Sequence, residues 1–197
     1  MGKGRLEAFS DGVIAIILTI MVLELHVPKD QAHLSDLRQV LPAFLSYILS
    51  FVYIGIYWNN HHHLLHATKQ VDSGVLWANL HLLFWLSLVP FATGWMGENH
   101  FAPTPTSIYG VNLLMCGAAF WLLQREIIQE QGKGSLVRRA LGDDLKGKIS
   151  LAAYALAIPL AYVSRWISGA LYVGVALLWL VPDRRIARAL ASRSEAA

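Results

Sequence analysis

The chain has 197 residues, of which 55% are hydrophobic and only 15% are charged, and its mean hydropathy is +0.46. This composition excludes an ordinary soluble domain, and it indicates an all-α membrane protein with one domain over residues 1–197. The net charge of +3 requires no nucleic-acid partner, because basic residues beside membrane helices contact lipid headgroups. Cys116 is the single cysteine, which excludes an intrachain disulfide and a thiolate metal cluster.

The apolar runs and the residues that interrupt them predict six membrane-spanning helices. We expect Ser35 to cap the second helix and Pro90 to kink the third. The last two helices are separated by only a residue or two, so they should form an antiparallel hairpin. The polar stretch 59–72, the stretch GENHFAPTPT (97–106) and the charged stretch 125–148 are expected to be loops. The six helices are expected at about residues 6–25, 37–58, 75–96, 108–123, 149–163 and 166–181.

The distribution of basic residues predicts that both termini are cytoplasmic. With six helices and the N-terminus inside, thirteen of the sixteen lysines and arginines fall in inner segments. Cytoplasmic loops retain basic residues during insertion, so the opposite orientation or an odd number of helices would contradict this distribution. The basic stretch DRRIARALASR (183–193) either contacts acidic lipid or is a solvated helix end.

The first predicted helix combines a membrane-length apolar run with a polar cluster at its inner end. Only Thr19 is polar within residues 13–23. An ionisable group inside the membrane is energetically costly, so a buried Asp11 would mark a pathway, a proton relay or a structural ion pair. The polar cluster consists of Arg5, Glu7, Ser10 and Asp11.

One face of this helix is an apolar stripe. Asp11 lies about 140° from the stripe around the helix axis, so it cannot line the surface that the stripe lines. Thr19 lies near the edge of the stripe, where it either faces the same space or bonds to the Ala15 carbonyl. Taken alone, such a stripe is also typical of simple helix packing. Its members are Ile16, Ile20 and Leu23.

The sequence RLEAFSDGVIAIILTIMVLEL (5–25) resembles the first helix of the transmembrane protein 175 family of potassium channels. The hallmark of that family is an arginine, three residues and then Phe-Ser-Asp, here Arg5, Phe9, Ser10 and Asp11. The resemblance continues in YWNNHHHLL (57–65) and WANLHLLFWLSLVPF (77–91), and in the six-helix layout. Bacterial members resemble a single six-helix unit of this length.

The resemblance implies a homotetramer in a bacterial cell membrane, with the first helix of each subunit lining a central pore. Ile16 matches the constriction position, and Thr19 matches a hydroxyl that supports selectivity. No TVGYG-type filter occurs in the sequence, so a ring of Ile16, Ile20 and Leu23 would form an apolar throat that closes by dewetting. Potassium holds its water less tightly than sodium, so such a throat favours potassium modestly among monovalent cations. No metal or organic cofactor is expected.

Two further polar groups of the first helix are expected to have electrostatic or structural roles. Glu24 at the outer mouth either adds a ring of negative charge that enriches cations, or is an interface residue or the partner of a loop base. Asp11, with Ser10 and Arg5, is expected to brace the first helix inside its own subunit. The candidate partners of Asp11 are His61, His62, Asn79 and His81.

Two other functional classes remain open from the sequence. A metal-dependent membrane enzyme would use the cluster of His61, His62 and His66, because His62 and His66 share one helical face. A proton-coupled carrier would use Asp11 as a titrating group, although no inverted repeat is visible. The sequence contains no nucleotide loop and no nucleophile paired with a base, so we expect a channel and not an enzyme.

Overall fold

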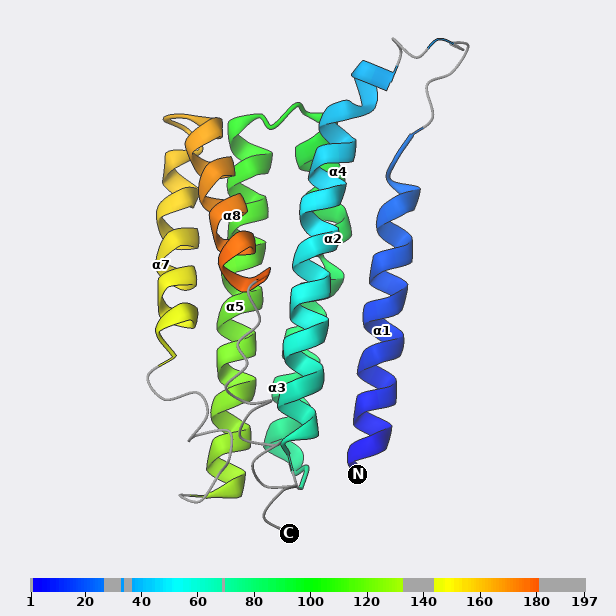
Figure 1. Ribbon diagram of the computed structural model, residues 1–197, viewed down its shortest axis with the longest axis vertical. Coiled ribbons are helices and arrows are strands. Elements are labelled where there is room, and N and C mark those ends of the chain that lie inside the picture. The colour runs from blue at the N-terminus through cyan, green and yellow to red at the C-terminus, as the bar shows by residue number, and fades with distance from the viewer. Residues whose placement is uncertain (1, 27–32, 34–36, 69, 133–143, 181–197) are drawn as a thin grey trace.

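The computed structural model describes residues 2–26, 33, 37–68, 70–132 and 144–180, and all regular structure in these ranges is helical. The helices run alternately up and down, with α1 at one edge of the bundle and the hairpin of α7 and α8 at the other (Figure 1). Because α3 and α4 follow one another almost without interruption, the described helices form six helical segments that cross the bundle. The helices are α1 (Lys3–Leu23), α2 (Leu37–His66), α3 (Ser73–Ser87), α4 (Val89–Glu98), α5 (Pro103–Gln131), α7 (Leu145–Leu160) and α8 (Arg165–Leu180).

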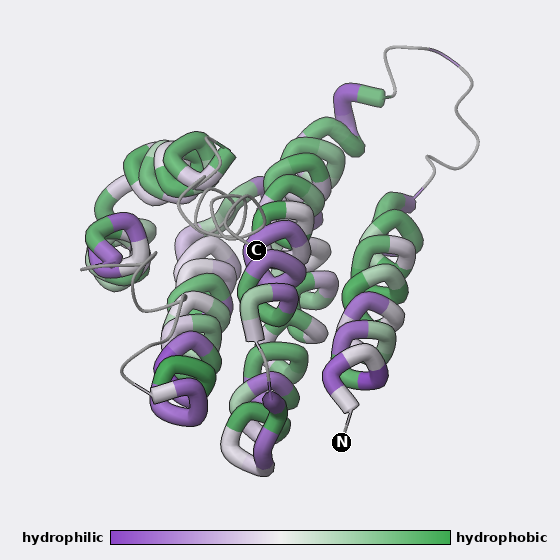
Figure 2. The backbone as a smooth tube through the Cα atoms, turned by 60° about the horizontal axis from the view of Figure 1, so that its bottom comes forward, coloured by the Kyte–Doolittle hydropathy of each residue, from purple (hydrophilic) through white to green (hydrophobic). Residues whose placement is uncertain are grey.

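Several of these helices have the length and composition of membrane spans. Four segments qualify, namely α1, α2, the combined range Ser73–Glu98 and α5, whereas α7 and α8 have only 16 residues each. Hydrophilic residues gather where α1 begins and where α2 and α5 end, at one end of the bundle (Figure 2). A multi-pass membrane protein is therefore confirmed. Ser35 and the basic stretch 183–193 lie outside the described residues.

The predicted kink in the third span is a complete break between α3 and α4. Pro90 lies at the start of α4 and has no N–H. The carbonyl four residues before Pro90 therefore has no N–H from that position to accept, which interrupts the helix. The Leu88 N–H donates to the Trp85 carbonyl at 3.3 Å. With the Asn112 amide of α5 turned so that both of its polar atoms have partners, its nitrogen donates to the same carbonyl at 3.0 Å and its oxygen accepts from the Val89 N–H at 3.3 Å. Asn112 therefore satisfies the backbone on both sides of the break.

All three predicted loops are helical over part of their length in the residues that the structure describes, and residues 133–143 of the third lie outside those residues. Helix α2 continues to His66. The polar residues after Trp58 either have partners inside the protein or lie at the end of the bundle where hydrophilic residues gather (Figure 2). Helix α5 begins at Pro103, since proline suits the first turn of a helix, where its missing N–H has no role. The same helix continues to Gln131 and ends at Gly132, whose φ is +72°. The polar residues and prolines at these helix ends therefore led to a wrong prediction of loops.

The core has two parts. The first holds α1 against α2, α3 and α4, and α3 against α5, through buried aliphatic side chains such as Ile14, Ile17 and Leu82. The second joins α2, α4 and α5 to the hairpin and is rich in tyrosine. The tyrosines are Tyr53, Tyr109, Tyr154 and Tyr172.

Close packing of α4 on α2 gives a testable consequence at Gly97. A Cβ added at Gly97 would lie 2.6 Å from the Ala43 Cα and would also meet the Ser46 hydroxyl. Gly97→Ala should therefore lower the free energy of unfolding by about 1–3 kcal/mol through overpacking. Gly55→Ala is the matched control, because nothing lies within 4 Å of a Cβ at that position. Thermal unfolding in detergent measures both, and an unchanged melting temperature for Gly97→Ala would contradict this packing.

Candidate functional site

Helix α1 has one buried face and one exposed face. The buried face packs on the bundle through Leu6, Ser10, Ile14, Ile17 and Met21. On the other face, four large apolar side chains are exposed. The predicted stripe therefore points away from the core of the bundle. Their exposed fractions are 49% for Phe9, 58% for Ile16, 41% for Ile20 and 75% for Leu23.

Thr19 is exposed beside this stripe. Its hydroxyl donates to the Ile16 carbonyl at 2.9 Å, so the predicted bond to Ala15 is wrong by one residue. A hydroxyl has one donor and two acceptor positions, and this bond uses the donor. The Thr19 oxygen therefore keeps its lone pairs for a cation or for water.

The family motif is divided between the two faces of α1. Arg5 and Phe9 lie within about 20° of Ile16 around the helix axis, and both are exposed. Ser10 is fully buried, and Asp11 is half-buried on the side that faces α2. Arg5 is therefore not part of the brace predicted for Ser10 and Asp11.

A buried chain of hydrogen bonds connects α1 to α3 and α2. The Asn79 amide donates to the Ser10 hydroxyl at 3.0 Å, and the Asn79 carbonyl oxygen lies 2.7 Å from the His61 Nε2. All three side chains are buried. The structure thus joins two residues of the predicted network, Asn79 and His61, and their contact on α1 is Ser10.

Asp11 has a different partner from those expected. Its Oδ1 accepts a hydrogen bond from the Trp58 indole N–H at 3.0 Å, and Trp58 in turn stacks on His62 with ring centroids 6.2 Å apart. Trp58 could not be singled out from the apolar pattern of the sequence, because it stands at the end of an apolar run and resembles an interfacial aromatic residue. Trp58 lies three residues before His61, so on a helix that continues past Trp58 the two side chains share one face. This spacing could have identified Trp58.

The remaining histidines do not assemble a metal site in the described part of the chain. His62 and His66 are exposed on one face of α2, with ring centroids 6.1 Å apart. His81 is separate, and its Nε2 accepts from the Trp85 indole N–H at 2.9 Å. Among the described residues no group of three or more metal-ligating side chains occurs. The metal-enzyme alternative therefore gains no support from the arrangement.

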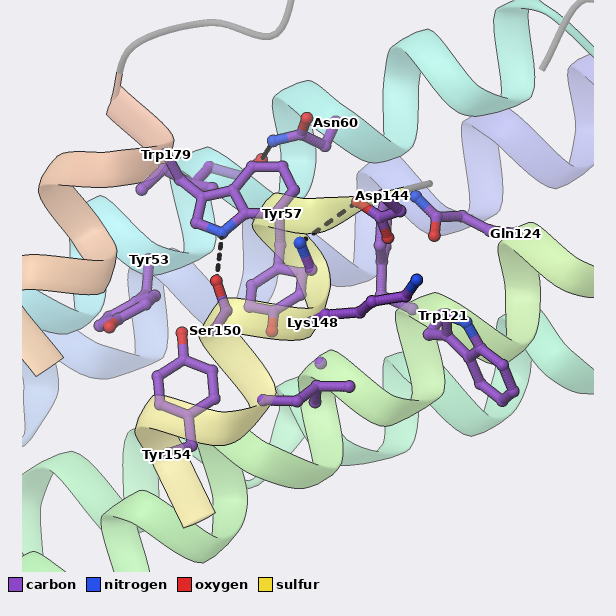
Figure 3. A pocket seen from close by; sticks show the side chains of 15 residues that line it. Tyr53, Tyr57, Asn60, Trp121, Gln124, Asp144, Lys148, Ser150, Tyr154 and Trp179 are labelled. Carbon is purple, nitrogen blue, oxygen red and sulfur yellow. Dashed lines mark hydrogen bonds between the residues drawn. The ribbon is translucent and has the colours of Figure 1, made fainter. Parts of the chain in front are cut away.

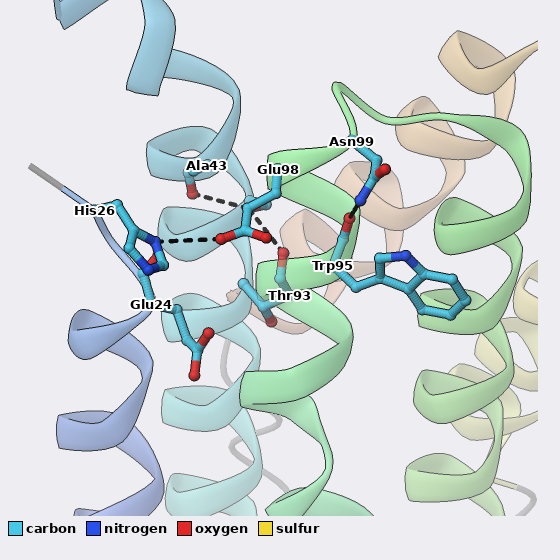
Figure 4. Close-up of polar contacts among 8 residues, drawn as sticks. Glu24, His26, Ala43, Thr93, Trp95, Glu98 and Asn99 are labelled. Atoms are coloured by element: carbon cyan, nitrogen blue, oxygen red, sulfur yellow. Dashed lines mark hydrogen bonds and ion pairs between the residues drawn. The ribbon is translucent and has the colours of Figure 1, made fainter. Parts of the chain in front are cut away.

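The C-terminal end of α1 meets α4 through acidic groups (Figure 4). Glu24 is half-buried, and its carboxylate packs so closely on Gly94 that a Cβ there would lie 3.0 Å from the Glu24 Oε2. The His26 Nδ1 lies 3.2 Å from the Glu98 Oε1, which is an ion pair when His26 is protonated. Glu24 also borders a groove between α1 and the α3–α4 break, which Ile16, Ile20 and Phe91 line.

Comparison with known proteins places this arrangement in a family. The family described as endosomal/lysosomal potassium channel TMEM175 matches residues 5–90. A potassium channel of Chryseobacterium sp. strain P1-3 is 52% identical over 96% of this chain and 98% of its own length. A potassium channel of Streptomyces collinus is 30% identical over 82% of this chain and 84% of its own length.

A solved structure shares the fold. It is the crystal structure of a lysosomal potassium-selective channel TMEM175 homolog from Chamaesiphon minutus, with a TM-score of 0.81 and 27% identity. The match covers 92% of this chain and 97% of that one. The similarity thus extends through the described helices and well beyond the motif of α1. This chain belongs to the TMEM175 family of potassium channels.

Proposed function

We propose that the chain is a cation channel that conducts potassium passively, with a modest preference over sodium, as a homotetramer whose α1 helices surround the pore. Both termini are cytoplasmic in this proposal, and the protein resides in a bacterial cell membrane. The observation that carries it is the exposed stripe of Ile16, Ile20 and Leu23 on a helix at the edge of the bundle (Figure 1). The potassium channels among its relatives support the choice of ion.

The surface around the stripe suits contact with further copies of the chain. Beside Ile16 and Ile20 the groove toward Phe91 has a volume of about 470 Å³ and is open to the outside of the subunit. Contacts between membrane helices depend on close packing, because lipid tails are as apolar as the side chains. A groove next to a ridge of isoleucines provides such a complementary surface for a neighbouring subunit.

The apolar stripe also accounts for gating in this proposal. Four Ile16 side chains meeting at an axis exclude water when they are close together, and the passage conducts when the helices tilt or rotate apart. An ion that crosses must lose part of its hydration shell, and potassium loses it at lower cost than sodium. No ring of backbone carbonyls is required for a preference of this modest size.

A bi-ionic reversal potential tests conduction and ion preference together. Purified protein in planar bilayers, with potassium on one side and sodium on the other, should reverse at a potential that favours potassium. The current should be only weakly voltage-dependent and should not saturate as a carrier would. Currents no larger than those of protein-free bilayers, or reversal at zero potential, would refute the proposal.

Thr19 offers a separate test of ion preference. Thr19→Val removes the exposed oxygen and keeps the shape, so the potassium-to-sodium permeability ratio should fall by about fivefold, equivalent to about 1 kcal/mol per ion. Thr104→Val is the matched control, because Thr104 is an exposed threonine of α5 far from α1. The ratio is measured from reversal potentials. An equal ratio in wild type and Thr19→Val would remove Thr19 from the selectivity mechanism.

A further inference from the structure

A second cavity lies far from α1, between α2, α5 and the α7–α8 hairpin (Figure 3). Its volume is about 330 Å³. The walls are mainly apolar and aromatic, and they are formed by Tyr53, Tyr57, Phe120, Leu151 and Tyr154. The cavity does not involve the stripe on α1, so the proposed channel function assigns it no role.

The mouth of this cavity is aromatic and basic. Trp121 and Trp179 both line it, with the Arg125 guanidinium 5.6 Å from the Trp121 ring and the Lys146 ammonium 5.9 Å from the Trp179 ring. Lys148 lines the same cavity and is exposed. Lys148 therefore places a cation in the lining itself, while Arg125 and Lys146 lie beside the two tryptophans.

An acidic side chain at the mouth offsets only part of this charge. Asp144 lines the cavity, but its Oδ1 accepts from the Gly147 N–H at 3.2 Å, so the carboxylate is engaged by the backbone of α7. The Trp179 indole N–H is also satisfied, because it donates to the Ser150 hydroxyl at 2.8 Å. Within the described residues, no ion pair neutralises the Lys148 ammonium. The Lys148 ammonium is thus available to an anionic ligand at this opening.

The polar lining of the cavity lies toward the hydrophilic end of the bundle. Its polar lining comes from Asn60 and Gln124, near the ends of α2 and α5, and from the first residues of α7. These segments belong to the end of the bundle where hydrophilic residues gather (Figure 2). Tryptophans with nearby cations are typical of the level of lipid headgroups. A phospholipid in the adjacent leaflet therefore has its phosphate at the height of the mouth.

We propose that this cavity is a binding site for an acidic phospholipid, whose phosphate contacts Lys148 and one of whose acyl chains enters between α2 and α7. An acyl chain gains little by leaving the bilayer for another apolar space, so the chain alone selects nothing. Selection comes from the headgroup, because a cationic opening favours a lipid with net negative charge over a zwitterionic one. This binding is independent of conduction through α1.

Native mass spectrometry of the purified full-length protein tests the site. The protein is released from detergent after equilibration with equimolar phosphatidylglycerol and phosphatidylcholine of matched chains. Wild type should retain phosphatidylglycerol preferentially. Lys148→Gln should weaken this retention about tenfold, as expected for loss of one charge-assisted contact. Lys148→Arg should keep the preference for phosphatidylglycerol. Arg38→Gln removes an exposed charge at the other end of α2, so it is the matched control and should leave this preference unchanged.

A second variant tests the position of the acyl chain. Leu151→Trp fills the cavity and leaves Lys148 in place, so it should also reduce retention of phosphatidylglycerol. Equal retention of the two lipids by wild type would overturn the proposal. Equal effects of Lys148→Gln and Arg38→Gln would do the same, because they would indicate general attraction to the surface. Full retention by Leu151→Trp would show that the cavity is not the site.

Discussion

Replacing Ile16 by asparagine should increase potassium flux through the reconstituted protein by about tenfold or more and should reduce its preference for potassium over sodium. In the proposed tetramer this substitution puts four amides at the narrowest point, where they hold water and ease the dehydration of the ion. A barrier lower by about 1.4 kcal/mol is sufficient for a tenfold increase. The measurement is single-channel current together with the reversal potential.

The matched control for this experiment is Val22→Asn. Val22 is also an exposed apolar residue of α1, with 47% of its surface accessible, but it lies about 120° from Ile16 around the helix. If α1 surrounds a pore, only the Ile16 variant should change conduction. If both variants behave alike, or if neither alters the current, Ile16 faces lipid or another helix and the proposed pore is wrong.

The apolar pattern of the sequence was sufficient to predict the membrane class and the two faces of α1, but not the ends of the helices. Ile16 and Asp11 were expected on opposite sides of the helix from the angular spacing alone, and the structure places Ile16 outside and Asp11 toward α2. Periodicity defines such a face because every residue of a helix advances by a fixed angle. It requires no knowledge of the other helices.

Partners across helices could not be predicted in the same way. Four polar residues were candidates for Asp11, yet the structure pairs Asp11 with Trp58 and Ser10 with Asn79. The polar sequence after Trp58 predicted a loop, whereas the helix continues because His61 is buried and hydrogen-bonded. Whether a polar residue ends a helix depends on a partner supplied by another helix, and a single sequence does not contain that information.

Replacing Asn79 by alanine should have the largest effect on stability, with a loss of about 2–4 kcal/mol in the free energy of unfolding. The substitution leaves the Ser10 hydroxyl and the His61 ring without their hydrogen bonds, and each unsatisfied buried group costs about 1–3 kcal/mol. Asn99→Ala is the control, because Asn99 is exposed and bonds only to the carbonyl of its own helix in the described structure. Thermal unfolding in detergent compares the two variants.

A double-mutant cycle separates this network from a general loss of packing. If Asn79 acts through Ser10, the combined variant Ser10→Ala with Asn79→Ala should be more stable, by about 1 kcal/mol, than the sum of the single effects predicts. The same bond sets the rotation of α1 about its axis, since Ser10 is fixed inward while Ile16 is fixed outward. Folded Asn79→Ala protein should therefore also lose part of its potassium preference. Additive stabilities with unaltered selectivity would show that Asn79 holds α3 and not the proposed pore helix.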